Sequence, residues 1–273
     1  MIFVDSDETD NRRETNSRIA DAKEYVAAER SKLVVSLKKV SLLREGRPIL
    51  ADLTWEVHEQ ERWALLGPNG SGKTTLLRIA GAQLRPSRGT AYILGERIGA
   101  SDLRQIRKRI GFMSPALGRQ LRMDETILEI VLSGRYAALE TWWNGYSSDD
   151  HQRAFQVLDD LGISRLADNS FGVISEGERQ LVLLARTLMT DPELLLLDEP
   201  VASLDMGARK RFLVQLERMA NDPQAPPYVL VTHRLEEIPK GTTHVALLKE
   251  GRLLAAGPLE QTLTDELLSD CFD

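Results

Sequence analysis

A glycine-rich segment in the first third of the chain restricts its fold more than any other feature. The segment fits the pattern G-x-x-x-x-G-K-[ST] at every position. It consists of Gly67, Pro68, Asn69, Gly70, Ser71, Gly72, Lys73, Thr74 and Thr75. Glycines let several backbone N–H groups converge on one phosphate, the lysine supplies a cation for the terminal phosphates, and the first threonine hydroxyl can ligate Mg²⁺. The segment therefore predicts a loop that binds a nucleoside triphosphate.

The residues on either side of this loop predict the fold class. Residues 63–66 are an apolar run typical of a buried strand, and residues 74–82 have the composition of a helix. A strand, a phosphate-binding loop and a helix in this order begin an α/β domain with a parallel sheet. Upstream, Leu53, Trp55 and Val57 alternate with polar residues, which indicates a half-buried antiparallel strand.

The chain divides into segments that differ in composition and in the spacing of their apolar residues. Residues 1–32 carry many charges and few large apolar side chains, so we expect a flexible N-terminal extension. Residues 33–273 are expected to form one domain. Within it, residues from about 114 to 174 have apolar side chains at helical spacing, notably in 125–132 and 151–161, and predict a helical insertion. The core then resumes with a helix to about 189, strands at 194–197 and 228–231, and a helix near 208–219 between them.

Two acidic residues directly follow the apolar run at 194–197, which suits a strand buried on both faces of a parallel sheet. Asp198 would emerge at the carboxyl end of this strand, where open α/β sheets bind ligands, and can hold Mg²⁺ directly or through water. Glu199 is positioned to polarise an attacking water. Two acids after an apolar run are by themselves more often a solvated strand end, but the phosphate-binding loop favours the catalytic interpretation.

A third motif precedes the helix that leads to the Asp198 strand. It consists of Ser175, Glu176, Gly177 and Glu178. In this order the three motifs resemble those of ABC (ATP-binding cassette) ATPases, whose signature usually reads Leu-Ser-Gly-Gly-Gln. Ser175 and Gly177 match the serine and the second glycine of that signature, whereas Glu176 replaces the first glycine. Either Glu176 points away from the phosphate, or the closed dimer is weaker than in typical members.

The resemblance extends over nearly all of residues 33–273. The chain is also similar in pattern to stand-alone cassettes of molybdate-type transporters. The resemblance implies a P-loop NTPase core of the RecA-like kind, with an N-terminal antiparallel β subdomain and an inserted α-helical subdomain. It further implies Mg²⁺-dependent hydrolysis of ATP, and a homodimer that sandwiches two ATP molecules. In that dimer residues 175–178 of one copy cap the ATP held by the other copy.

Two more motifs follow in the order that the family requires. Asp205 resembles the D-loop aspartate, which would tie the two sites together across the dimer. His233 resembles the switch histidine that contacts the γ-phosphate. The resemblance thus implies Lys73, Glu199 and His233 as catalytic residues, and Thr74 and Asp198 as metal ligands.

The chain departs from the family pattern at two further places. Arg44 stands where many relatives have an aromatic residue that stacks on adenine; a guanidinium plane can stack on a purine too, or the side chain is simply solvated. Pro115 stands where the Q-loop glutamine is expected, and Gln120 is displaced by several residues. We therefore expect Mg²⁺ to be held by Thr74, Asp198, phosphate oxygens and water.

In the insertion, Trp142 and Trp143 suit a core or an exposed docking surface equally well.

Composition and charge bear on location and partners. No apolar run approaches the roughly eighteen residues that a membrane span needs, and the acidic N-terminus does not resemble a signal peptide. The single cysteine, Cys271, fits a reducing compartment. We expect a cytoplasmic chain that reaches the inner face of a membrane through a partner and does not insert into the membrane. The net charge of −6 argues against nucleic-acid binding.

Three functions stay open. The leading interpretation is the energy-coupling subunit of a transporter whose membrane-spanning subunits are separate chains, because the chain holds one cassette and no membrane segment. The alternative is a soluble ABC ATPase in regulation or nucleic-acid maintenance, which the missing Q-loop glutamine and the altered signature favour. The third is a degenerate module that barely hydrolyses ATP, against which Lys73, Asp198, Glu199 and His233 argue. The sequence names no transported substrate.

Overall fold

The computed structural model describes residues 32–136 and 145–272. Of the expected N-terminal extension, residues 1–31 lie outside the described residues, and so do Trp142 and Trp143. Leu33–Asp273 form one compact unit, which contains a four-stranded and a six-stranded sheet.

The first sheet is antiparallel and has the strand order β2-β1-β4-β5. Its strands are β1 (Leu33–Arg44), β2 (Arg47–His58), β4 (Arg88–Ile93) and β5 (Glu96–Arg97). The predicted alternation in β2 is confirmed, because Leu53, Trp55 and Val57 are buried while the residues between them are exposed. This sheet forms the N-terminal β subdomain that the resemblance implied.

The second sheet has the order β10-β9-β3-β8-β7-β6 and is parallel except for the edge strand β10. Its strands are β3 (Arg62–Leu66), β6 (Ile110–Met113), β7 (Leu194–Asp198), β8 (Tyr228–Val231), β9 (His244–Lys249) and β10 (Arg252–Pro258). In β7, Leu194 and Leu196 join the core shared with the antiparallel sheet, whereas Leu195 and Leu197 join a core shared with the helices. The prediction of a strand buried on both faces is therefore confirmed.

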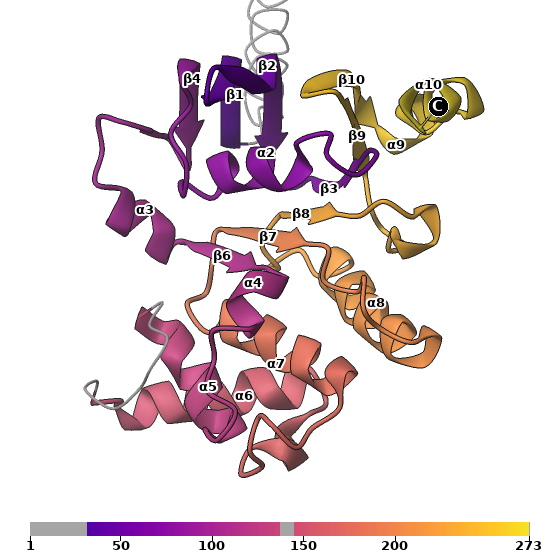
Figure 1. Cartoon of the computed structure of the whole chain (residues 1–273). Coiled ribbons are helices and arrows are strands. Elements are labelled where there is room, and N and C mark those ends of the chain that lie inside the picture. Colours follow the sequence, from indigo (N-terminus) through magenta and orange to yellow (C-terminus); the bar gives the residue numbers. More distant parts are fainter. Residues whose placement is uncertain (1–31, 137–144, 273) are drawn as a thin grey trace, which may run out of the picture. The chain divides into compact units, whose positions relative to one another are not determined.

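Helices cover both faces of this sheet (Figure 1). They are α2 (Lys73–Ala80), α3 (Leu103–Lys108), α4 (Pro115–Gly118), α5 (Ile127–Ser133), α6 (Ser148–Asp160), α7 (Glu176–Leu188), α8 (Met206–Ala220), α9 (Leu259–Thr262) and α10 (Asp265–Phe272). Between β6 and α7 the described residues contain helices and one isolated β-bridge, so the predicted helical insertion is confirmed. Among the described residues, no helix is long and apolar enough to cross a membrane.

The three longer helices around this insertion begin in the same way. Thr126, Ser147 and Ser175 are the N-cap residues of α5, α6 and α7, and each forms a reciprocal capping box with an acidic residue three positions later. A capping box satisfies two backbone N–H groups that a helix start leaves without partners. The sequence thus specifies where each helix begins, and α7 begins within the motif at residues 175–178.

Candidate functional site

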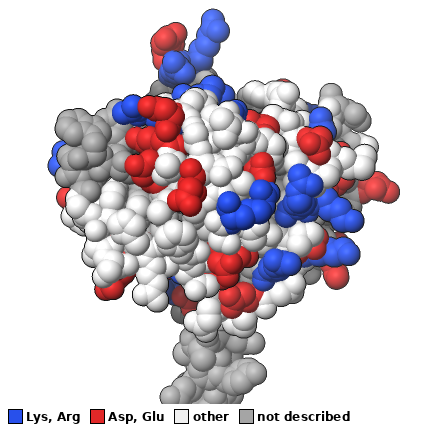
Figure 2. All heavy atoms as spheres, turned by 90° about the horizontal axis from the view of Figure 1, so that it is seen from below, with Lys and Arg blue, Asp and Glu red and all other residues white. Residues whose placement is uncertain are grey.

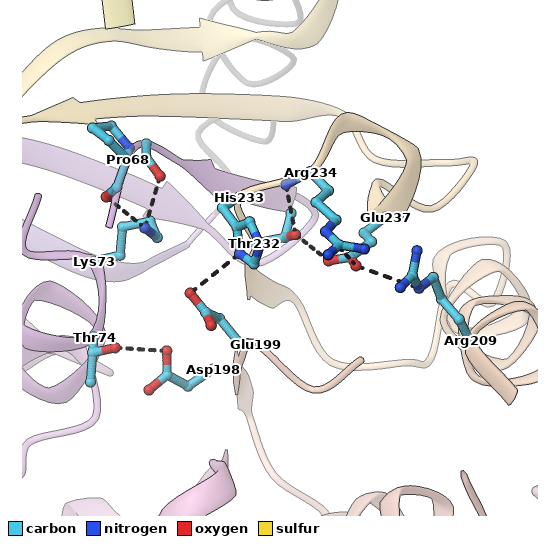
Figure 3. A network of polar contacts seen from close by, with 11 residues as sticks. Pro68, Lys73, Thr74, Asp198, Glu199, Arg209, Thr232, His233, Arg234 and Glu237 are labelled. Atoms are coloured by element: carbon cyan, nitrogen blue, oxygen red, sulfur yellow. Dashed lines mark hydrogen bonds and ion pairs between the residues drawn. The ribbon is translucent and has the colours of Figure 1, made fainter. Parts of the chain in front are cut away.

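The predicted catalytic residues meet at one edge of the parallel sheet. The glycine-rich loop follows β3, Asp198 is the last residue of β7, and His233 lies two residues beyond β8. Since β3, β8 and β7 are neighbours in the sheet, their carboxyl ends bring these residues together, although they are far apart in sequence. Figure 3 shows them at close range.

The glycine-rich loop is packed so tightly that two of its positions admit only glycine. Gly67 has φ 153° and Gly72 has φ 104°. A Cβ atom on Gly67 would lie 2.1 Å from the backbone oxygen of Leu248, and one on Gly72 would lie 2.8 Å from Cδ2 of Leu50. The loop therefore exposes backbone with few side chains, and this fits a cradle for phosphate groups.

Lys73 is buried beside this loop. Its Nζ donates hydrogen bonds to the backbone oxygens of Gly67 (2.8 Å) and Pro68 (3.0 Å), and the residue is only 5% exposed. Burial lowers the pKa of Lys73, while the carboxylates of Glu199 and Asp198 counter the shift. The ammonium group thus lies within the electrostatic reach of both acids.

Thr74 and Asp198 form a pair across 124 positions of the sequence. The Thr74 hydroxyl donates to Oδ1 of Asp198 at 3.0 Å. Burial raises the pKa of Asp198, and the hydrogen bond from Thr74 partly offsets this. Two oxygen ligands fit Mg²⁺, which usually takes its other ligands from phosphate and water. Within the described residues no group of three His, Cys, Asp or Glu side chains could hold a metal.

Glu199 and His233 face each other next to this pair. Oε1 of Glu199 lies 3.7 Å from Nδ1 of His233, and both side chains are about 30% exposed. Glu199 has φ 48°, a left-handed conformation that costs a non-glycine residue about 1–3 kcal/mol. Its N–H donates to the backbone oxygen of Val231 at 3.1 Å, which holds the end of β7 against β8. The fold thus holds Glu199 in an unfavourable conformation that points its carboxylate at His233.

A cleft of about 650 Å³ opens beside these residues, and Thr74, Asp198 and Glu199 line it. Pro115 and Gln120 line the same cleft. Pro115 is the first residue of α4, behind the N-cap Ser114, a position that proline favours. Gln120, which is displaced by several residues in sequence, is nevertheless brought to the cleft that contains the predicted metal ligands.

Comparison with known proteins shows the family of the chain. The family model described as ABC transporter matches residues 50–202. The ABC transporter ATP-binding protein YlmA of Bacillus subtilis (strain 168) is 40% identical over 242 residues, which cover 88% of this chain and 91% of YlmA. The chain belongs to the ABC transporter family.

Two further relatives extend the comparison. The phosphonates import ATP-binding protein PhnC 1 of Ruegeria sp. (strain TM1040) is 31% identical, over 77% of this chain and 82% of PhnC 1. The solved dimeric ATP-binding cassette MJ0796, in a post-hydrolysis state bound to ADP and Pi, is 27% identical with a TM-score of 0.70, over 82% of this chain and 98% of that chain. The P-loop NTPase fold predicted for this cassette is thereby confirmed.

The predicted signature residues, 175–178, lie at the start of α7 and are not among the residues that line the cleft described above. Ser175 accepts a hydrogen bond from the N–H of Glu178 (3.3 Å), and its own hydroxyl donates to Oε2 of Glu178 (2.8 Å). Glu176 accepts a hydrogen bond from Gln180 (3.0 Å) and lies 3.5 Å from Arg179. Glu176 is therefore bonded within α7, whereas Glu178 bonds the N-cap Ser175 and also Arg165, which lies outside the helix.

Gly177 has a role inside the chain. A Cβ atom at this position would lie 2.6 Å from Cβ of Ala208, the third residue of α8. The absence of a side chain therefore lets α7 pack closely against α8. Asp205, the predicted D-loop residue, is the N-cap of α8, and its Oδ1 accepts from the N–H of Ala208 at 2.8 Å.

Arg44 is exposed at the end of β1, beside a two-residue turn. Its stacking on adenine stays a prediction.

The sequence analysis missed a buried acid next to the site. Glu237 is only 1% exposed and contacts the residues on both sides of His233 (Figure 3). The pair of acids at 236 and 237 carried no signal of burial, since acids so soon after a strand are usually solvated.

Proposed function

We propose that this chain is the ATP-hydrolysing subunit of a membrane importer. One observation carries the proposal: a buried lysine, a threonine–aspartate pair and a glutamate–histidine pair converge at the carboxyl ends of three neighbouring strands (Figure 3). This is the set of groups that a phosphoryl transfer to water needs, because its catalysis depends on positioning and on charge stabilisation.

Each group has a role in hydrolysis of ATP to ADP and phosphate. Lys73 exchanges its bonds to Gly67 and Pro68 for bonds to the terminal phosphates. Thr74 and Asp198 would hold Mg²⁺, which neutralises charge that develops on the phosphate oxygens. Glu199 orients the attacking water and takes up its proton, while His233 contacts the γ-phosphate. The side chain of Pro115 supplies no oxygen for the metal, whereas Gln120 on the same cleft carries one.

The proposal includes an ATP-dependent homodimer. Residues 175–178 stand at the start of α7 and Asp205 at the start of α8, and none of them bonds to Lys73, Thr74 or Asp198 among the described residues; a second copy would bring its own signature to the bound triphosphate. The dimeric form of MJ0796 bound to ADP and Pi supports this arrangement. In it Ser175 caps the ATP of the partner, and Asp205 links the two sites.

Transport is the proposed use of this hydrolysis. PhnC 1 serves an import system, which supports an importer whose membrane-spanning subunits are separate chains and a place for this cassette on the cytoplasmic face. On the face in Figure 2, Lys and Arg side chains gather right of the centre, with Asp and Glu side chains beside them and a separate acidic group on the left. The transported substrate and the molybdate-type placement stay open.

The variant Glu199→Gln tests the enzyme and the dimer together. We expect its ATP turnover to fall by about 10²- to 10⁴-fold, because the amide cannot take up the proton of the water. It should also stay dimeric at saturating Mg-ATP, measured by size-exclusion chromatography with light scattering. A variant that stays monomeric under these conditions would refute the sandwich.

Lys73→Ala is the matched control. It should lose most nucleotide affinity, measured by calorimetry, and should stay monomeric with or without Mg-ATP. Unchanged affinity would contradict the role of the glycine-rich loop.

Capture of membrane proteins from solubilised membranes by the Glu199→Gln dimer would support transport, whereas capture of soluble proteins alone would favour a soluble ABC ATPase.

A further inference from the structure

A single buried carboxylate fixes the segment that carries His233. Glu237 ends the 3₁₀ helix Leu235–Glu237, and one of its oxygens accepts a hydrogen bond from the Thr232 hydroxyl. The same hydroxyl accepts from the N–H of Arg234 at 3.1 Å, and Nε of Arg234 lies 4.0 Å from Glu237. Both neighbours of His233 are thus connected to Glu237.

His233 depends on these neighbours for its position. Its Nδ1 lies 3.7 Å from Glu199, too far for a hydrogen bond, and among the described residues this atom has no hydrogen-bond partner. The ring is therefore oriented through the backbone that Thr232 and Arg234 hold, not by bonds of its own.

The other side of Glu237 faces α8. Nε of Arg209 lies 3.5 Å from Oε1 of Glu237, and the Arg209 side chain is only 19% exposed. Arg209 in turn donates from its backbone N–H to the backbone oxygen of Asp205 (2.9 Å) and from its guanidinium to that of Leu204 (3.4 Å). The carboxylate of Glu237 therefore connects the His233 segment to the residues of the D-loop.

Burial strengthens the electrostatic part of this connection, because a buried carboxylate needs charged partners. Glu237 is almost fully buried; its Oε2 accepts from Thr232, whereas Oε1 has no hydrogen bond and is paired by charge alone, with Arg209 and Arg234. The pairing requires Thr232, Arg209 and Arg234 to keep their places. A displacement of the start of α8 would therefore move the segment of His233 with it.

We infer that Glu237 is a positioning residue for ATP hydrolysis, which holds His233 opposite Glu199 and couples it to the D-loop through Arg209. The inference rests on the proposed function. In the proposed dimer Asp205 reaches toward the partner's site, so Glu237 relays the state of that site to His233.

The test compares Glu237→Gln with Glu236→Gln. The glutamine at 237 keeps an acceptor for Thr232 but removes the charge that faces the two arginines. We expect kcat for ATP to fall about 10-fold or more, while KM and the ATP affinity change less than about twofold, because Lys73, Thr74 and Asp198 are untouched. Glu236 is the matched control: its side chain is 64% exposed and 3.9 Å from Arg209, and its variant should keep wild-type kcat.

A second pair of variants guards against a folding defect. Thr232→Val removes the hydroxyl and should lower kcat, whereas Thr232→Ser keeps it and should restore kcat. Arg209→Gln should lower kcat as well, and the double variant with Glu237→Gln should be no slower than the single ones, since both break one connection.

The outcomes separate the inference from the proposed function. Wild-type protein that does not hydrolyse ATP would refute the proposed function. Wild-type hydrolysis with a Glu237→Gln kcat within twofold of it would refute only the inference. Equal losses of kcat in Thr232→Val and Thr232→Ser, or additive losses in the double variant, would also overturn the inference.

Discussion

Asp198 illustrates at the residue scale how function opposes stability. The side chain is 6% exposed, and burial raises its pKa because the fold disfavours the charged form. It lies at the end of a fully buried strand, and among the described residues the donor to its side chain is Thr74. The proposed site for a divalent cation therefore carries an anion that destabilises the folded chain at neutral pH.

Replacing Asp198 by Asn should accordingly stabilise the fold. We expect a gain of about 1 kcal/mol, or about 2–4 °C in Tm, at pH 7, together with loss of Mg²⁺-dependent hydrolysis. A raised pKa in the folded state means that the charged form costs stability only above the ordinary aspartate pKa of about 3.9. The advantage of Asn should thus grow as pH rises from about 4 through the raised pKa. Thermal melts of both proteins from pH 4 to 8 measure this, and a Tm of the variant below that of wild type at pH 7 would contradict it.

At the scale of the element, the first turn of α7 has two roles: it caps the helix, and in the proposed dimer it contacts a triphosphate. Ser175 and Glu178 form the capping box that starts the helix, and Arg165 adds an ion pair to Glu178 at 2.6 Å. These hydrogen bonds from Ser175 lower the pKa of Glu178, so it stays ionised. In the proposed dimer the same turn contacts the partner's triphosphate. The Ser175 hydroxyl must then exchange its hydrogen bond to Glu178 for one to a phosphate oxygen.

Glu178→Gln should therefore tighten the ATP-bound dimer. The amide oxygen can still cap Ser175, but the negative charge that opposes the partner's triphosphate is gone. In the Glu199→Gln background we expect the dimer Kd to fall several-fold, measured by analytical ultracentrifugation with Mg-ATP. As a control, Glu178→Ala should lose the cap and about 1 kcal/mol of stability. A dimer no tighter than the parent would show that this carboxylate does not limit closure.

At the scale of the whole molecule, the parallel sheet gathers groups that no single segment contains. The loop after β3, the end of β7 and the turn after β8 become one site only because those strands are neighbours. Nucleotide binding therefore draws on most of the core and should stabilise it as a unit.

We expect Mg-ATP at about 100 times Kd to stabilise Glu199→Gln by about 2.7 kcal/mol, which is about 5–11 °C in Tm. Because the bound form is proposed to dimerise, this Tm should also rise with protein concentration. Lys73→Ala should show neither effect. A shift independent of protein concentration would support binding of ATP without the dimer.

The local sequence was sufficient for most of the fold. The alternation in β2, the apolar run of β7 and the capping residues of α7 specify their elements through contacts between near neighbours in the chain. The glycine-rich loop was also predicted from its local pattern alone. Gly67 and Gly72 belong to that pattern because only glycine fits the crowded space at these positions.

Tertiary structure alone decided the rest, since it depends on which distant segments become neighbours. Only the fold shows that Thr74 donates to Asp198, that Gln120 lies on the cleft with them, and that Glu237 is buried between His233 and α8. An acid beside another acid after a strand looks solvated in any local pattern. Its burial follows from the packing of α8 against the sheet, which no short stretch of sequence encodes.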